Sequence, residues 1–335
     1  MFHLSFLRPG ALLLGFVAAF APAAMTNAQL TPNRLYFGVN RPIPMAVAVP
    51  DGAEGAVSIE LMAPGPNGSS DATSVAMVEV ESGGVDLAGL FPILWTAEKP
   101  RLLYAQLVVA GDPVGPAVVL QPLLTPAQAK AAGRNIQFAP SQQMYSGLRA
   151  YVDQHVVFDT SEGEIEIALR PDQAPNTAFN LLSLVKGGFY TDIIVHRVVP
   201  TNPQGNPFVI QFGDPTGTGG GGPGYFTDLE PSTLPHDFGV VSMARTSAPD
   251  TNGSQVFICL SRAGTSFLDH KYVSFAQTVR GADTILKIEG TKLQSAQSGR
   301  PVNPPVIKKA WTVDAPPYGT GPAPVVRPPA SDGSR

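Results

Sequence analysis

The chain has 335 residues, a length that predicts about two domains with connecting segments and tails. Charged residues make up only 14% of the chain and the formal net charge is -4, which argues against a nucleic-acid partner, because such a partner favours a basic surface. Glycine and proline, at 34 residues each, favour strands, turns and loops over long helices. The single cysteine, Cys259, has no partner for a disulfide or a metal site, so the fold must depend on burial.

Residues 1–28 have the layout of a secretory signal peptide. A weakly cationic start that includes Arg8 is followed by an apolar run, residues 12–20, that is too short to span a bilayer. Small residues follow, and cleavage is expected after Ala23 or Ala28; an uncleaved N-terminal anchor is the alternative. We therefore expect an exported protein, periplasmic or secreted, with no integral membrane segment after cleavage.

Residues 29–122 alternate short apolar strands with segments rich in turn-forming residues. Strands are expected at residues 45–49, 57–61, 75–80 and 103–109. Regular short strands of this kind predict a small module that resembles an all-β sandwich. The module contains no catalytic group of residues, so we interpret it as a spacer or a binding module.

Residues 123–150 are interpreted as a linker that contains one short helix. Thr125 and Pro126 suit a helix N-cap and first turn, and Gly133 suits the end of the helix. At the other end of the chain, residues 315–335 are rich in Pro, Gly and Ala. Because such a segment buries little apolar surface, we expect a disordered tail.

Residues 151–314 have the pattern of a compact, mainly β domain. Ile165, Ile167 and Leu169 alternate with polar or small residues, which is typical of a half-buried strand. Apolar residues at helical spacing predict a helix over residues 178–185. Further strands are expected at 195–199, 208–212, 240–243, 256–260, 273–277 and 306–313. Many strands with one or two helices favour a closed β-barrel, which leaves no exposed strand edge.

Five motifs follow one another in this domain, and their order and spacing are more specific than any one motif. They are the segments 189–200, which contains His196-Arg197-Val198-Val199-Pro200, 211–219, 241–246, 251–258 and 267–275. Together these segments resemble the motifs of cyclophilin-type peptidyl-prolyl cis/trans isomerases, over about half of the chain. The resemblance implies a closed eight-stranded antiparallel β-barrel with two helices.

The chemistry of such an isomerase explains the residue types in these motifs. Rotation about an X-Pro bond crosses a barrier of roughly 18–20 kcal/mol, but no covalent bond breaks, so neither cofactor nor metal is needed. The catalyst must favour the twisted amide, in which the prolyl nitrogen regains a lone pair. Arg197 can aim a permanently charged donor at that nitrogen, while an apolar pocket holds the proline ring.

The resemblance implies a catalytic set and a substrate-binding set. The catalytic set is Arg197, Phe208, Gln211 and Phe257. The substrate-binding set is His196, Val209, Gly217, Ala244, Arg245, Gln255, Phe267, Leu268 and Tyr272. The segment 201–207 is longer than the usual family link and is expected to reshape the rim of the pocket beside Phe208.

The expected function is isomerisation of X-Pro bonds during the folding of exported proteins, with proline-containing peptides or unfolded proteins as partners. The alternative is a proline-peptide-binding or scaffold protein on the same fold, with little isomerase activity. Retention of Arg197 favours the isomerase, whereas the long segment 201–207 and the extra N-terminal module keep the alternative open.

Overall fold

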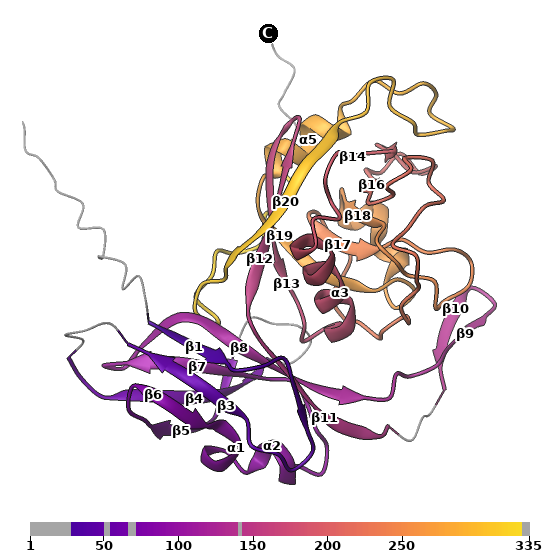
Figure 1. Cartoon of the computed structure of the whole chain (residues 1–335). Helices are drawn as coiled ribbons and strands as arrows, with labels where there is room; N and C mark the ends of the chain where they lie inside the picture. The colour runs from indigo at the N-terminus through magenta and orange to yellow at the C-terminus, as the bar shows by residue number, and fades with distance from the viewer. Residues whose placement is uncertain (1–27, 50–53, 66–71, 140–142, 330–335) are drawn as a thin grey trace, which may run out of the picture.

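A computed structural model describes residues 28–49, 54–65, 72–139 and 143–329 of the chain (Figure 1). Residues 1–27 of the predicted signal peptide lie outside these ranges. The described part is mainly β with few helices, which confirms the expected fold class at this level. None of its helices has the length and apolar character needed to cross a membrane.

Two packed sheets form the N-terminal unit, which is coloured indigo to magenta in Figure 1. The first sheet has the order β1 (Gln29–Pro32), β3 (Pro44–Ala48), β6 (Gly83–Asp86). The second has the order β2 (Tyr36–Gly38), β11 (Tyr145–Val152), β8 (Asp112–Leu124), β7 (Leu103–Val109), β4 (Val57–Pro64), β5 (Ala72–Glu79). Two short helices, α1 (Leu87–Leu90) and α2 (Ile93–Thr96), follow β6.

Alternation along the strands supplies the core of this unit. In β3, Met45 and Val47 are buried while their neighbours are not, and β4 buries Leu61 and Ala63 in the same way. Both pairs join Leu30 of β1 in one apolar cluster. The two sheets therefore share a single core, as in a β-sandwich.

The N-terminal unit uses more of the chain than expected. β8 continues to Leu124, and β11 returns from residue 145 as an inner strand between β2 and β8. Residues 145–150 were interpreted as linker, but Leu148 and Ala150 bury apolar side chains in the core of the unit. The linker prediction is therefore wrong for this segment.

The short helix expected after Thr125 is also absent, because residues 129–138 form a hairpin of β9 (Ala129–Ala132) and β10 (Asn135–Phe138). Gly133, with φ near 62°, supplies the two-residue turn. Ile136 and Phe138 alternate with polar residues, which is the period of a strand and lets one face pack on the neighbouring core. This tertiary packing outweighs the local preference of Thr125 and Pro126 for the start of a helix.

The second unit is built on one antiparallel sheet of nine strands. Its order is β14 (Ile193–Ile194), β20 (Val306–Asp314), β12 (Gln154–Thr160), β13 (Gly163–Leu169), β19 (Ser274–Arg280), β17 (Val240–Met243), β18 (Val256–Cys259), β16 (Val209–Phe212), β15 (Arg197–Val199). The expected eight strands are thus nine, and among the described residues the strand pairings do not join β14 to β15. These two edge strands are separated in the chain only by Val195 and His196.

The two longer helices of this unit and the aromatic rings of the sheet share one buried cluster. α3 (Pro175–Lys186) buries the apolar face predicted from its spacing, and α5 (Ala282–Glu289) buries Ile285 and Ile288. The ring of Phe158 lies edge-on to Tyr190 and to Phe212, with centroids 5.6 and 5.2 Å apart. The remaining helical turns, α4 (Arg262–Thr265) and the 3-10 helix η2 (Ser266–Leu268), lead to the candidate site.

The two units share an apolar seam. Tyr104 and Val119 of the N-terminal unit belong to the same buried cluster as Phe158 of the second unit. Beside this seam, the guanidinium of Arg149 lies 4.0 Å from the centre of the Phe179 ring on α3. The N-terminal unit therefore packs directly on the second unit.

The expected disorder of the C-terminal tail is wrong for residues 315–329. Tyr318 stacks on the buried ring of Tyr104, with centroids 3.9 Å apart. Further on, the amide of Val325 donates to the carbonyl of Thr278 at 2.9 Å. The Pro-rich segment forms no regular secondary structure, but its aromatic side chain and backbone donors find partners across both units. Residues 330–335 lie outside the described ranges.

Candidate active site

Three neighbouring strands place the predicted polar site residues side by side. Register pairs join Arg197 of β15 to Gln211 of β16, and Gln211 to Phe257 of β18. The Nη1 of Arg197 donates to Oε1 of Gln211 at 3.2 Å, and Nε2 of Gln211 donates to Oε1 of Gln255 at 2.9 Å. The Arg197 guanidinium is thus held by a chain of amides, with donors left over because guanidinium carries five N–H groups.

A small apolar pocket of about 130 Å³ opens beside Arg197. It brings together nine of the thirteen predicted site residues, and its lining is Arg197, Phe208, Val209, Gln211, Ala244, Arg245, Phe257, Leu268 and Tyr272. Phe257 and Leu268 are buried in an apolar cluster below the opening. A charged donor therefore stands at the edge of a pocket large enough for a small apolar ring.

Aromatic contacts fix the shape of this pocket. The ring of Phe257 lies edge-on to Tyr272, with centroids 5.8 Å apart. The ring of Phe208 stacks on Phe267, with centroids 5.7 Å apart and planes 15° apart. The guanidinium of Arg245 lies 4.6 Å from the centre of the Tyr272 ring and also donates to the carbonyl of Lys271. Each wall is therefore braced by a neighbour.

Behind Phe257 lies a buried support that the sequence did not reveal. His236 stacks on the Phe257 ring, its Nδ1 lies 3.0 Å from Oδ1 of Asp269, and Asp269 accepts from Arg262 at 2.6 Å. Burial lowers the pKa of His236 despite the Asp269 carboxylate. Nδ1 can donate to the Asp269 carboxylate, which only accepts, and Nε2 lies 3.1 Å from Oγ of Ser242, whose hydroxyl donates to the carbonyl of Val273 at 2.9 Å.

This support was missed because its parts are far apart in sequence. His236 is 33 residues from Asp269, and no spacing rule for metal ligands or catalytic groups links the two. Asp269 does lie inside the motif at 267–275, so the motif was the only available signal.

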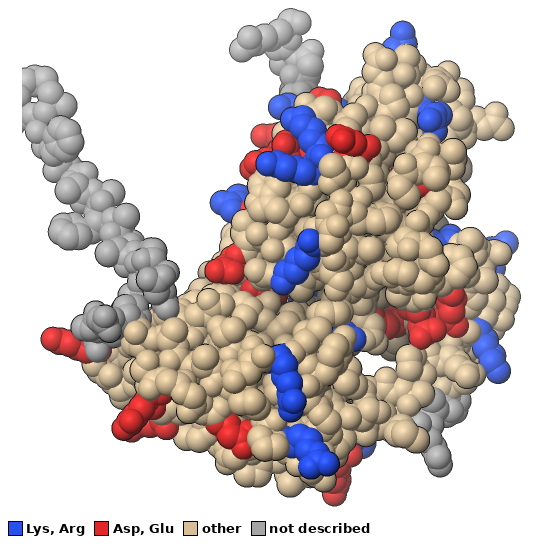
Figure 2. Space-filling model, viewed as in Figure 1, with Lys and Arg blue, Asp and Glu red and all other residues tan. Residues whose placement is uncertain are grey.

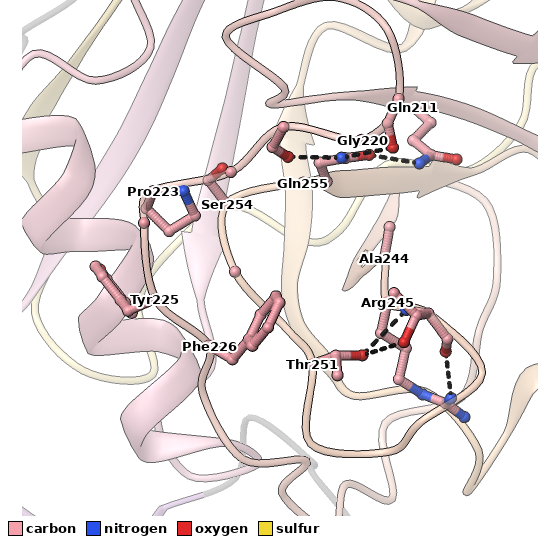
Figure 3. Close-up of a pocket in the computed structure, with 16 residues that line it drawn as sticks. Gln211, Gly220, Pro223, Tyr225, Phe226, Ala244, Arg245, Thr251, Ser254 and Gln255 are labelled. Atoms are coloured by element: carbon pink, nitrogen blue, oxygen red, sulfur yellow. Dashed lines mark hydrogen bonds between the residues drawn. The ribbon is translucent and has the colours of Figure 1, made fainter.

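A larger hollow of about 600 Å³ continues from the apolar pocket and shares Gln211, Ala244 and Arg245 with it. Figure 3 shows its glycine-rich edge, residues 219–224, lying over Gln255. The Nε2 of Gln255 donates to the carbonyls of Gly219 and Gly221 at 3.0 and 2.8 Å. Gln255 therefore joins the glycine-rich loop to the amide chain that holds Arg197.

Asp214 shapes the start of the glycine-rich loop. Its carboxylate accepts from the amide and hydroxyl of Thr216 and from the amide of Gly219. Burial opposes ionisation, but these hydrogen bonds outweigh it and lower the pKa of Asp214 to about 2. A Cβ at Gly221 would lie 2.1 Å from Oδ1 of Asp214, so this glycine is needed for the close approach.

Four predicted site residues do not line the apolar pocket. Gln255 lines the larger hollow, and Phe267 lies exposed at the rim against Phe208. His196 and Gly217 are buried, and neither lines the apolar pocket or the larger hollow. The next residue, Arg197, is exposed and lines the apolar pocket.

The long segment 201–207 does not reshape the apolar pocket as expected. Asn202 is buried, and its Oδ1 accepts from the amides of Gln204 and Asn206, both at 3.0 Å. At the end of the segment, the carbonyl of Pro207 accepts from the hydroxyl of Ser261, the N-cap of α4. The segment folds onto α4, and none of its residues lines the pocket.

Three other features of the described residues bear on metal binding, thiol chemistry and charged partners. Across these ranges, His, Cys, Asp and Glu form no group of three or more that could hold a metal ion. Cys259 is buried, and burial raises the pKa of its thiol well above the usual range. On the face shown in Figure 2, Lys and Arg stand singly or beside Asp and Glu and form no continuous basic surface.

Comparison with known proteins identifies the class of protein that this site defines. A family model described as cyclophilin type peptidyl-prolyl cis-trans isomerase/CLD matches residues 155–312. The chain belongs to the cyclophilin-type peptidyl-prolyl cis-trans isomerase family and is an enzyme of that type, as the sequence motifs predicted. The match excludes the N-terminal unit.

Individual relatives align over about half of the chain. Peptidyl-prolyl cis-trans isomerase-like 1 of Aspergillus fumigatus is 38% identical over 164 residues, which cover 48% of this chain and 95% of the relative. Peptidyl-prolyl cis-trans isomerase ppi1 of Schizosaccharomyces pombe is 40% identical over 161 residues, with coverages of 47% and 97%. A crystal structure of a Cryptosporidium parvum cyclophilin type isomerase in the presence of the dipeptide Ala-Pro shares 34% identity, with a TM-score of 0.43, and covers 48% of this chain and 99% of that one.

Proposed function

We propose that this isomerase assists the folding of exported proteins, with Arg197 as the donor that stabilises the twisted X-Pro amide. The observation that carries the proposal is the position of Arg197 at the edge of the apolar pocket that contains Phe257 and Leu268. A proline ring held in that pocket would present its nitrogen to the guanidinium. The other predicted lining residues would hold the flanking backbone.

The proposed mechanism requires only selective stabilisation of the twisted state. In a planar amide the nitrogen lone pair is delocalised, so a donor gains little from it. When the amide twists, the lone pair localises and a charged N–H group can donate to it. Gln211 and Gln255 fix the guanidinium beforehand, so little reorganisation remains for the reaction. Each ~1.4 kcal/mol of such selective stabilisation raises the rate about tenfold.

A proline-peptide-binding or scaffold role remains the second candidate. It is favoured by the N-terminal unit, which lies outside the family match and packs directly on the isomerase unit. In that case the apolar pocket would bind proline without accelerating its isomerisation.

The test is a protease-coupled isomerisation assay of a short X-Pro peptide with the full chain and with Arg197→Ala. The proposal predicts acceleration by the full chain, and a loss of most of that acceleration in Arg197→Ala. If the folded full chain binds the peptide without accelerating it, the scaffold role replaces the catalytic one.

Export is proposed on the sequence of the first 28 residues, which lie almost entirely outside the described ranges. N-terminal sequencing of the protein from its native source should find a mature end after Ala23 or Ala28. An intact Met1 on protein from the cytosolic fraction would refute export.

A further inference from the structure

The β9–β10 hairpin, residues 129–138, lines a groove beside the isomerase unit. This hairpin, called the arm here, lies outside the matched residues 155–312 and extends from the N-terminal unit to the isomerase unit (Figure 1). Ile136 and Phe138 of the arm pack against the buried cluster that contains Leu229. Figure 2 shows an opening between the base of the arm and the body of the molecule.

A groove of about 200 Å³ lies where the arm meets the isomerase unit. Its walls are Ile136 and Phe138 of the arm, the segment 229–233, and residues 270–272. Tyr272 lines both this groove and the apolar pocket beside Arg197. The arm therefore adds a second apolar hollow directly beyond one wall of the proposed proline pocket.

Shared lining residues make the three hollows neighbours in a row. The larger hollow shares Gln211, Ala244 and Arg245 with the apolar pocket, and the apolar pocket shares Tyr272 with the arm groove. An extended polypeptide whose proline occupies the middle pocket would continue over a neighbouring hollow on each side. A longer peptide covers more of this series than a tetrapeptide, since each extended residue spans only about 3.3 Å.

The backbone of β10 also suits an extended partner. The amide of Ala139 donates to the carbonyl of Gln128, so the hydrogen-bonded pairs with β9 fall on residues 135, 137 and 139. The amides and carbonyls of Ile136 and Phe138 therefore point away from β9. In the described ranges they have no backbone partner, which leaves an edge that a strand can join.

We propose that the arm groove is a second binding subsite for the client polypeptide, which takes an apolar side chain from the segment adjoining the bound proline. The inference rests on the proposed function of the middle pocket. The occupant is a client segment because the groove adjoins that pocket, with Tyr272 lining both, and offers apolar walls beside a free strand edge. The N-terminal unit thereby contributes directly to the choice of substrate.

The test compares two substrates in the isomerisation assay. One is a short X-Pro tetrapeptide; the other extends the same tetrapeptide on both sides with alternating apolar residues. The full chain should give a higher kcat/KM for the long peptide. Loss of one buried apolar contact should lower that value by about tenfold or more, while the tetrapeptide value stays within about twofold.

Two variants change the groove in opposite ways. Phe138→Ser removes an apolar wall, whereas Ile136→Trp fills the groove and keeps the arm apolar against the isomerase unit. Gln137→Ser is the matched control, because Gln137 is exposed on the opposite face of the same strand. Thermal unfolding of each variant establishes that it is folded.

The outcomes separate this inference from the proposed function. Selective loss of long-peptide activity in both groove variants, but not in Gln137→Ser, supports the subsite. Equal kcat/KM for both peptides in the full chain, or groove variants that retain the long-peptide advantage, would overturn it. Parallel loss for both peptides would mean that the arm merely supports the proline pocket, which also overturns it. Failure of the full chain on the tetrapeptide itself would instead refute the proposed catalysis.

Discussion

Replacement of Phe257 by alanine tests whether the apolar pocket binds proline, because Phe257 lies at the bottom of that pocket. Phe257 is 5% exposed and contacts both Tyr272 and the buried His236 through its ring. The substitution Phe257→Ala removes a large buried side chain, and such changes lower the free energy of unfolding by about 3–5 kcal/mol. The variant should therefore unfold at a clearly lower temperature than the parent chain.

The same substitution should weaken peptide binding. The ring of Phe257 faces the pocket, and loss of apolar burial for a large side chain is equivalent to about 1.5–3 kcal/mol. This corresponds to a Kd for an X-Pro peptide that is about ten- to a hundredfold higher. Titration calorimetry below the unfolding temperature of the variant measures the Kd directly.

Two control variants separate pocket loss from general destabilisation. Phe257→Leu keeps an apolar side chain in the pocket and should show a smaller rise in Kd. Phe158→Leu changes a ring that is equally buried but lies in the interior of the sheet, away from the pocket, and should lower stability without changing the Kd. A folded Phe257→Ala variant with an unchanged Kd would show that proline binds elsewhere.

Three further predictions concern the supporting structure. Gly217→Ala should lower the free energy of unfolding in denaturant titrations by at least roughly 1–2 kcal/mol, because φ is near 65° and the added Cβ would lie 2.7 Å from Cδ1 of Ile194; an unchanged midpoint would refute the strain. Tyr318→Ala should lower the Tm through loss of the stack on Tyr104, whereas a mobile tail would leave it unchanged. Burial raises the pKa of Asp153 to about 7, so the folded chain binds the extra proton between about pH 4 and pH 7 and its stability declines as pH rises through that window. Asp153→Asn should therefore raise the Tm above pH 7 and leave it nearly unchanged near pH 4, and an equal effect at both pH values would contradict this assignment.

The predictions that succeeded rest on local sequence signals. Alternation at Ile165, Ile167 and Leu169 specified a strand, and helical spacing specified α3, because each pattern reflects which side chains face the core. Most of the site residues could be predicted from the sequence for the same reason. Arg197 and Gln211 lie inside contiguous motifs, so their placement on paired strands follows from the local fold.

The predictions that failed depend on partners distant in sequence. The helix expected after Thr125 became a hairpin because Ile136 and Phe138 bury against the isomerase unit. The tail is ordered up to residue 329 because Tyr318 finds the ring of Tyr104 more than two hundred residues away. Composition and local spacing contain no information about such partners.

The most direct test of the account is the substitution Arg197→Lys, followed by exchange NMR of an X-Pro peptide in the presence of the full chain. This experiment reports the cis/trans exchange rate and the bound fraction of the same peptide. Lysine keeps the charge but loses the planar head that Gln211 holds in place. The account predicts an exchange rate at least about tenfold lower with a bound fraction close to that of the parent chain. Nearly full exchange in Arg197→Lys would show that charge alone suffices, and would contradict the role of Arg197 as an aimed donor.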